Sequence, residues 1–170
     1  MPNTDTSQNH GLALAPEELA ALRQAIAASR EALDAGNAPY GATLVSAAGE
    51  VLQVARNTQV TSDDFTAHAE MVAVRETTDR LGAGAVQGST VFASGEPCAM
   101  CAGAMFWAGV KRVVYGATNP QMAALFGGQS LPIRCADVVA GASPVMQVDG
   151  PVLGDEAMAV LQDAAARRTN

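Results

Sequence analysis

The sequence predicts an α/β protein in which helices cover both faces of one sheet. The first observation is the alternation of helix-like and strand-like segments, in the order α-β-β-α-β-α-β-(α)-β-α, which is typical of layered α/β folds. The second is the composition: 170 residues, 49% of them apolar and only 4% aromatic, suffice for one core with closely packed helices. We therefore expect residues 1–15 to form a flexible tail and residues 16–170 to form a single domain.

In the first half of the chain, the pattern predicts a helix over 16–35, strands over 41–47 and 51–55, and a helix over 66–81. Pro16 suits the first position of the first helix, and Gly36 is suited to end it. The turn residues 48–50 favour a hairpin between the two strands. The polar residues 57–65 predict a loop, and Thr66 is a favourable N-cap for the second helix.

In the second half, the predicted elements are a strand over 90–93, a helix over 97–108, a strand over 112–116, a short helix or turn over 119–127, a strand over 145–148 and a helix over 155–168. Pro97 suits the first position of its helix. The glycines at 127 and 128 end the short helix or turn. Residues 129–144 show no regular pattern and predict irregular chain.

The charge and the cysteine content restrict the class of protein. The formal net charge of −7, with ten basic residues and no long basic run, makes nucleic acid an unlikely partner, because a phosphate backbone must be neutralised by Lys and Arg. No uninterrupted apolar run reaches 18 residues, so we expect no membrane span, and the polar start has no secretory signal pattern. Three cysteines, two of them in one short motif, favour a reducing cytoplasm over a disulfide framework.

The residues that carry chemistry are His68-Ala69-Glu70 and Pro97-Cys98-Ala99-Met100-Cys101. One imidazole and two thiols are ligands for a catalytic zinc ion, one per chain, which keeps its fourth position for water. The i,i+3 spacing places both sulfurs on one helical face, and a helix N-terminus favours the thiolate. Glu70 remains free to move the protons of that water. Cys135 is the one further cysteine that could close a structural zinc site, but we expect it to be a buried or pocket-lining thiol.

With this H-x-E…P-C-x-x-C pattern the chain resembles the cytidine-deaminase-like superfamily of zinc deaminases, and most of all its bacterial guanine deaminase and tRNA adenosine deaminase branch. The resemblance covers about residues 16–126. It implies a three-layer αβα sandwich with a five-stranded mixed sheet, and a homodimer. It also implies hydrolysis of a C–N bond in a cyclic amidine, with Glu70 passing a proton from water to a ring nitrogen and then to the leaving amine.

The resemblance also implies substrate contacts at single positions. Asn57 matches an asparagine that hydrogen-bonds the base, and the backbone N–H of Ala69 faces the base carbonyl or the developing oxygen. Tyr40 matches an aromatic residue at the pocket rim, and Trp107 an aromatic ring that stacks on the base, unless it belongs to the core or to a dimer interface. Gln129 lies where guanine deaminases carry an acidic residue.

The chain departs from the family pattern at Phe65, which replaces a proline before the histidine motif. Its ring either packs against the following helix as a hydrophobic staple or reaches the pocket. The segment 126–144 is our candidate for substrate specificity and gating.

Three hypotheses for function follow. The first is a deaminase of a small free heterocycle, with guanine leading and cytosine, another aminopurine or an amino-triazine as alternatives. The second is deamination of adenosine in tRNA: residues 101–105 and 112–116 resemble that branch, but the charge and the lack of a basic cluster in the last helix oppose it. The third is a zinc-stabilised module without activity, which Glu70 argues against.

Overall fold

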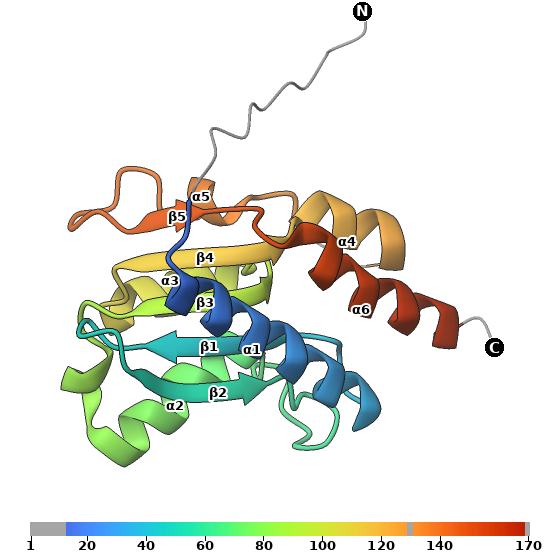
Figure 1. Ribbon diagram of the computed structural model, residues 1–170, viewed down its shortest axis with the longest axis horizontal. Coiled ribbons are helices and arrows are strands. Elements are labelled where there is room, and N and C mark those ends of the chain that lie inside the picture. Colours follow the sequence, from blue (N-terminus) through green and yellow to red (C-terminus); the bar gives the residue numbers. More distant parts are fainter. Residues whose placement is uncertain (1–12, 129–130, 169–170) are drawn as a thin grey trace, which may run out of the picture.

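The computed structural model describes residues 13–128 and 131–168, and it shows a five-stranded mixed sheet between two layers of helices (Figure 1). The strands are β1 (Gly41–Val45), β2 (Val51–Arg56), β3 (Thr90–Gly95), β4 (Arg112–Ala117) and β5 (Gln147–Asp149). The helices are α1 (Pro16–Asp34), α2 (Ala69–Leu81), the 3₁₀ helix η1 (Ala83–Val86), α3 (Ala99–Ala108), α4 (Asn119–Phe126), α5 (Cys135–Val138) and α6 (Gly154–Arg168). The predicted three-layer αβα sandwich is confirmed.

Two hydrophobic clusters fill the space on either side of the sheet. On one face, α1 and α6 contribute Leu22 and Leu161 to a cluster with Phe92 of β3. On the other face, α2 and α3 contribute Val72 and Met105 to a second cluster. In Figure 1 the first pair of helices lies in front of the sheet and the second pair behind it. Many of the buried residues are alanines, which allow the helices to approach the sheet closely.

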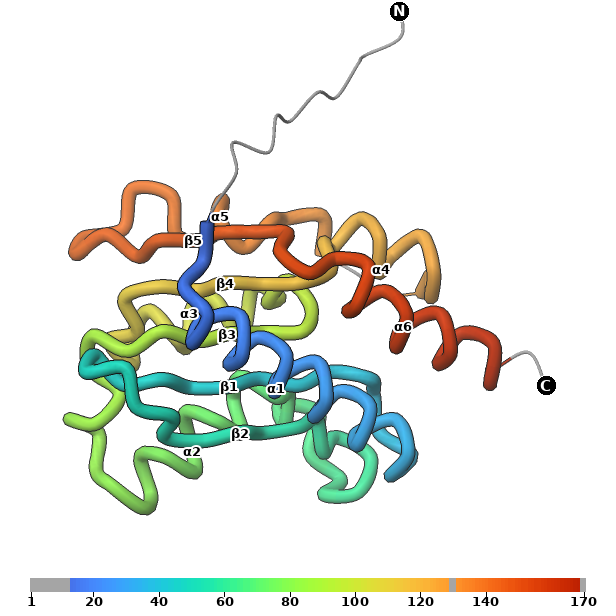
Figure 2. Tube along the Cα trace, in the orientation of Figure 1, coloured from blue at the N-terminus to red at the C-terminus, as the bar shows by residue number. Residues whose placement is uncertain are grey.

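The strand order β2-β1-β3-β4-β5 contains one antiparallel and one parallel half. Strand β1 pairs antiparallel with both β2 and β3, whereas β3, β4 and β5 are parallel. Helix α3 connects β3 to β4, which lie side by side in the same direction (Figure 2). Because the carboxyl ends of parallel strands share one edge of a sheet, the segments after Gly95 and after Ala117 meet at that edge, where ligands of open α/β sheets bind.

Most predicted elements lie within one to three residues of the observed ones, and two segments differ. The stretch 129–144, predicted as irregular, contains the short helix α5 in its described part, and the loop after α2 contains η1. The last strand begins at Gln147 instead of residue 145. These short elements lack a pattern of apolar residues long enough to be recognised in a sequence. The predicted tail lies outside the described residues except for 13–15, and α1 begins at Pro16 as expected.

None of the described helices is both long enough and apolar enough to cross a lipid bilayer.

We predict that Gly41→Ala destabilises the fold, because α1 lies directly against the start of β1. A Cβ atom at Gly41 would lie 2.1 Å from the carbonyl oxygen of Ala25 and 2.6 Å from the backbone nitrogen of Ser29. Overpacking against backbone atoms should lower the free energy of unfolding by about 3 kcal/mol, measured by urea denaturation. Gly84→Ala is the matched control, since its Cβ meets no atom within 4 Å, and it should change stability by less than about 1 kcal/mol. Equal effects of the two substitutions would contradict the packing argument.

Candidate metal centre and catalytic site

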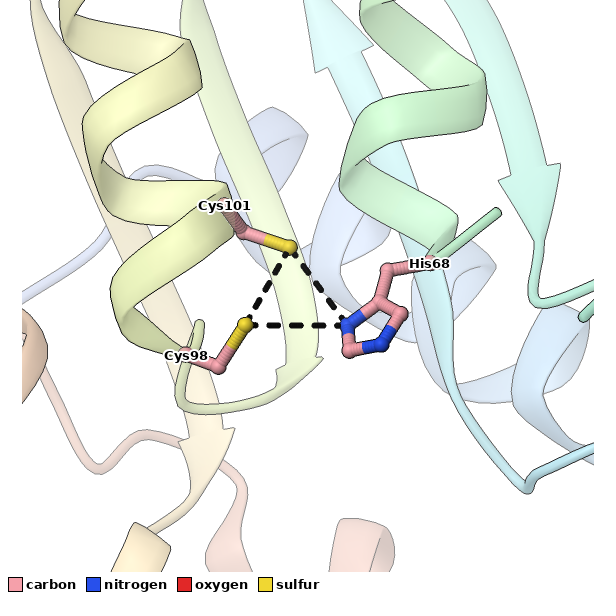
Figure 3. Close-up of side chains that lie close together, drawn as sticks. All are labelled: His68, Cys98 and Cys101. Carbon is pink, nitrogen blue, oxygen red and sulfur yellow. Dashed lines mark hydrogen bonds between the residues drawn. The ribbon is translucent and has the colours of Figure 1, made fainter. Parts of the chain in front are cut away.

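Three side chains from two helix N-termini converge on one point (Figure 3). His68 is the N-cap residue of α2, Cys98 is the N-cap residue of α3, and Cys101 lies in the first turn of α3. The Nδ1 atom of His68 lies 3.7 Å from Sγ of Cys98 and 3.6 Å from Sγ of Cys101. The two sulfur atoms are 3.7 Å apart.

These separations fit a zinc ion. Tetrahedral zinc, with Zn–S bonds of about 2.3 Å and Zn–N bonds of about 2.0–2.1 Å, requires sulfurs roughly 3.8 Å apart and nitrogen–sulfur distances of roughly 3.6 Å. The observed distances of 3.7 Å, 3.7 Å and 3.6 Å agree with these values. Within the described part of the chain, the cluster of candidate ligands comprises His68, Cys98 and Cys101 and no fourth residue. Such a set leaves one position open for water or substrate.

The chain before α2 folds so that His68, and not Thr66, caps the helix. The N–H and the hydroxyl of Thr66 both donate to Oδ1 of Asp64, at 2.8 Å and 2.6 Å, which forms a local turn. Thr66 is thus part of this turn, two residues before the observed N-cap, so the predicted cap is wrong and α2 begins at Ala69. His68 is flanked by Ala67 and Ala69, both fully buried, which fixes its backbone.

The helix that carries Cys98 and Cys101 also begins later than predicted. Pro97 was expected at the first position of its helix, but it precedes the N-cap residue Cys98 and is fully buried. The preceding residue, Glu96, donates its backbone N–H to the carbonyl of Ala117 at 2.7 Å, which ties the ligand segment to the end of β4. The thiols of Cys98 and Cys101 thus lie over the carboxyl edge of the parallel half of the sheet.

The two thiols differ in their surroundings. The hydrogen bond to Cys101 lowers the pKa of Cys98 to about 4, and the same bond together with burial raises the pKa of Cys101. The hydrogen bond to Cys98 raises the pKa of His68. A lowered pKa at Cys98 favours the thiolate, which is the form in which cysteine binds a metal.

Glu70 lies beside the cluster without belonging to it. Glu70 is buried, with 6% of its surface exposed, and its Oε2 atom lies 3.6 Å from Sγ of Cys101. Burial raises the pKa of Glu70 to about 6, which suits a group that accepts and releases protons near neutral pH. Glu70 is in the first turn of α2, where the helix dipole also favours a carboxylate.

A cavity of about 680 Å³ opens next to these residues. Its volume is in the range of small-molecule sites. Its lining includes His68, Glu70 and Cys98, and also apolar side chains of α4, among them Met122 and Phe126. Residues 131–134, which follow in the chain, line it as well.

Not all of the residues predicted to contact the substrate line the cavity. Tyr40 lines the cavity, and burial raises the pKa of its hydroxyl to about 12. Ala69 is the first residue of α2, where the helix leaves the backbone N–H without an intrahelical acceptor. Asn57 is fully buried, but its amide bonds the neighbouring Gln59, with Oδ1 accepting from the backbone N–H at 3.1 Å and Nδ2 donating at 2.7 Å. It does not line the cavity. Gln129 lies outside the described residues.

The two aromatic residues predicted near the substrate lie at the surface of the chain. Trp107 is 84% exposed and does not line the cavity. Its position follows from the helix: Met105 faces the core, and a residue two positions later is turned by about 200°. The stacking role expected of Trp107 is therefore not met within one chain. Phe65 is 82% exposed, does not line the cavity, and so does not reach the pocket.

Glu96 and Arg134 line the cavity and were not anticipated from the sequence. The side chain of Glu96 is only 1% exposed and accepts hydrogen bonds from Nε of Arg134 at 2.8 Å and 2.9 Å. It also accepts from the backbone N–H groups of Cys135 at 3.0 Å and Asn119 at 2.9 Å. The only signal in the sequence was the position of Glu96 two residues before Cys98. Cys135 itself is buried, as expected, and burial raises its pKa to about 12.

A model of the cytidine and deoxycytidylate deaminase zinc-binding region matches residues 16–117, and the chain belongs to this family. Members of the family are hydrolytic deaminases of nucleobases or nucleosides. The cluster of His68, Cys98 and Cys101 lies within this zinc-binding region, and its three side chains could hold the metal ion.

Several relatives show how far the similarity extends. A protein described as "Probable cytosine deaminase" from Schizosaccharomyces pombe is 37% identical over 149 residues, covering 85% of this chain and 90% of that protein. In Bacillus subtilis, a guanine deaminase is 38% identical over 60% of this chain and 65% of its own length. A tRNA-specific adenosine deaminase of the same species is 38% identical over 59% of this chain and 62% of its own length. The solved guanine deaminase of Nitrosomonas europaea shares the fold, with a TM-score of 0.76 at 24% identity over 91% of this chain and 86% of that chain.

We predict that the purified protein contains one zinc ion per chain, and that Cys98→Ser or Cys101→Ser removes it, because each substitution takes away one of three ligands. Elemental analysis of the purified variants measures this. Cys135→Ser is the matched control, since Cys135 lies outside the cluster, and it should retain the metal. Loss of zinc from the control alone would show that the ligand set is wrong.

Proposed function

We propose that this protein deaminates a free nucleobase or a heterocycle of similar size, releasing ammonia and leaving a carbonyl group in place of the amino group. The position of Glu70 carries this proposal. A buried carboxylate lines the cavity beside the metal ligands, 3.6 Å from Sγ of Cys101. A zinc site that only stabilises a fold is closed by four protein ligands and has no use for a free carboxylate at its side.

The reaction adds water to the carbon that bears the amino group and then breaks the bond from that carbon to nitrogen. Zinc, when bound by His68, Cys98 and Cys101, supplies a nucleophile at neutral pH by lowering the pKa of water to about 7. Glu70 takes a proton from the water and gives it to the adjacent ring nitrogen. It then takes the proton of the newly added hydroxyl and carries it to the amine, which leaves as ammonia while the hydroxyl oxygen becomes the carbonyl of the product. The backbone N–H of Ala69, at the N-terminus of α2, donates to the oxygen that gains negative charge.

Guanine and cytosine are the leading substrates. Guanine was favoured by the sequence, and a guanine deaminase is 38% identical over 60% of this chain. Cytosine is supported by the relative described as "Probable cytosine deaminase", which aligns over 85% of this chain. Adenosine in tRNA ranks below both, although a tRNA-specific adenosine deaminase is 38% identical to this chain, because a net charge of −7 opposes binding to a phosphate backbone.

Ammonia release from guanine, cytosine, adenine, an amino-triazine and tRNA separates these substrates, and activity on tRNA alone would reverse the ranking.

Glu70→Gln should lower kcat at least about 10³-fold while the zinc content stays unchanged, because it removes proton transfer and leaves the three ligands in place. Steady-state ammonia release and elemental analysis measure the two effects. Glu76→Gln, an exposed substitution on the same helix, is the control and should keep full activity. Full activity of the Glu70 variant would refute its role in proton transfer.

We further propose that the enzyme is a homodimer through the outer face of α3. On this face Trp107 is 84% exposed and Met100 36% exposed, and a Cβ atom at Gly103 would meet nothing within 4 Å. The ring of Trp107 packs edge-on against Phe106, with centroids 5.2 Å apart. An aromatic pair on an open, apolar helix face is suited to cover the same face of a second copy.

Trp107→Glu should shift the protein from dimer to monomer, because it buries a charge in that contact. Sedimentation velocity at several protein concentrations measures the change. Phe65→Glu is the control, since Phe65 is similarly exposed but lies in the loop before α2 and not on α3, and it should leave the dimer intact. A monomeric wild-type protein would exclude this interface.

We also infer that the enzyme works in the cytoplasm. Two of its three metal ligands are thiols, and all three cysteines are free in the structure. A reducing compartment keeps such thiols available for the metal.

A further inference from the structure

Arg134 is held in the cavity wall by two partners that leave part of its guanidinium unused. Nε donates to the carboxylate of Glu96, and Nη2 donates to the hydroxyl of Tyr115 at 3.2 Å. A guanidinium carries five N–H donors in a fixed plane. These bonds use two of the donors, so about three remain without an acceptor among residues 13–128 and 131–168. The side chain is 42% exposed and lines the same cavity as Glu70 and His68.

The Glu96 carboxylate cannot accept a hydrogen bond from the remaining Arg134 donors, because its acceptor positions are already used. It already takes the Arg134 guanidinium and the backbone N–H groups of Cys135 and Asn119. The other lining residues of α4 and 131–133 are apolar, among them Met122, Phe126 and Ile133, except for Asn119 at the start of α4. The Arg134 guanidinium therefore presents oriented hydrogen-bond donors to the cavity, for which a ligand can bring the acceptor.

The chemistry of the pair indicates what kind of acceptor fits. Glu96 neutralises Arg134, so the pair carries no net charge, and a neutral oxygen suits it better than a phosphate. An exocyclic amino group is a donor and would face another donor. Guanine and cytosine both carry a ring carbonyl one ring nitrogen away from the carbon that bears the amino group, whereas adenine has no carbonyl.

We infer that Arg134 is a specificity-determining residue: its remaining N–H groups donate to a ring carbonyl oxygen, so that the substrates are aminated heterocycles that also carry such an oxygen. The inference rests on the proposed deaminase function and narrows its substrate class. It places guanine and cytosine together and excludes as good substrates adenine, adenosine and other compounds whose aminated ring carries no carbonyl oxygen.

The test uses pairs of compounds that differ at this oxygen. Guanine is compared with 2-aminopurine, and cytosine with 4-aminopyrimidine, by kcat/KM of the zinc-loaded enzyme. The wild-type protein should prefer the oxygenated member of each pair by about 10- to 100-fold, as expected for a hydrogen bond to a partly exposed charged group. Arg134→Met, which keeps the unbranched stem of the side chain but removes the guanidinium and its donors, should reduce this preference to less than about 3-fold.

Two further variants separate recognition from folding. Arg134→Met leaves Glu96 buried without its cation, which costs stability. The double substitution Glu96→Gln with Arg134→Met removes that uncompensated charge and should show the same loss of preference. Arg167→Met, which removes another ion-paired arginine from α6, should keep the wild-type preference. An unchanged preference in both Arg134 variants, or an equal loss of activity on both members of a pair, overturns the inference.

A binding measurement makes the result independent of turnover. Titration calorimetry with the Glu70→Gln protein should show the same preference for guanine over 2-aminopurine, and its loss when Arg134→Met is added. Selective binding without ammonia release from any base would contradict the proposed function and support the role of Arg134. Deamination with no dependence on Arg134 would support the proposed function and contradict the role of Arg134. A preference for GMP over guanine that disappears in Arg134→Met would show that a phosphate is bound, and would overturn the inference, as would the absence of any base binding.

Discussion

The approach of two helix N-termini over one sheet edge is the constraint on which the site depends. It brings Nδ1 of His68 to 3.6–3.7 Å from two sulfur atoms that lie on the other helix. The distances already match those that a tetrahedral zinc ion requires. The buried alanines beside His68 and the buried Pro97 before Cys98 hold both backbones in place. The burial of Glu70 and the shape of the cavity follow from the same arrangement.

Two buried carboxylates near this centre have opposite surroundings. Glu96 accepts hydrogen bonds from Arg134 and from two backbone N–H groups, so its negative charge is fully matched. Glu70 has no cation beside it, only a thiol sulfur at 3.6 Å and its own backbone N–H, and burial raises its pKa to about 6. The first environment suits a residue that holds chain segments together, and the second suits a residue that exchanges protons. Acidic residues in one cavity can thus differ in function because of their partners.

The sequence predicts the layers, the order of helices and strands along the chain, and the three residues that come together as candidate metal ligands, because these depend on local patterns. It does not predict features that tertiary contacts decide. Thr66 is a favourable N-cap by residue type, but it lies in a turn with Asp64 and α2 begins three residues later. Trp107 was expected beside the substrate, but the rotation of α3 that buries Met105 turns it outward. The pairing of Glu96 with Arg134 joins residues 38 positions apart, which no local pattern indicates.

Part of the cavity lining comes from α4 and residues 131–134, which lie after β4 and beyond the metal motifs in the chain. This late segment is joined to the metal motif at Glu96, two residues before Cys98, which accepts from Arg134 and from the backbone N–H of Cys135. We therefore expect a substitution at Arg134 to be felt at the metal ligands as well as in the cavity. A substitution at an apolar lining residue such as Ile133, which takes no part in that connection, is expected to change the shape of the cavity alone.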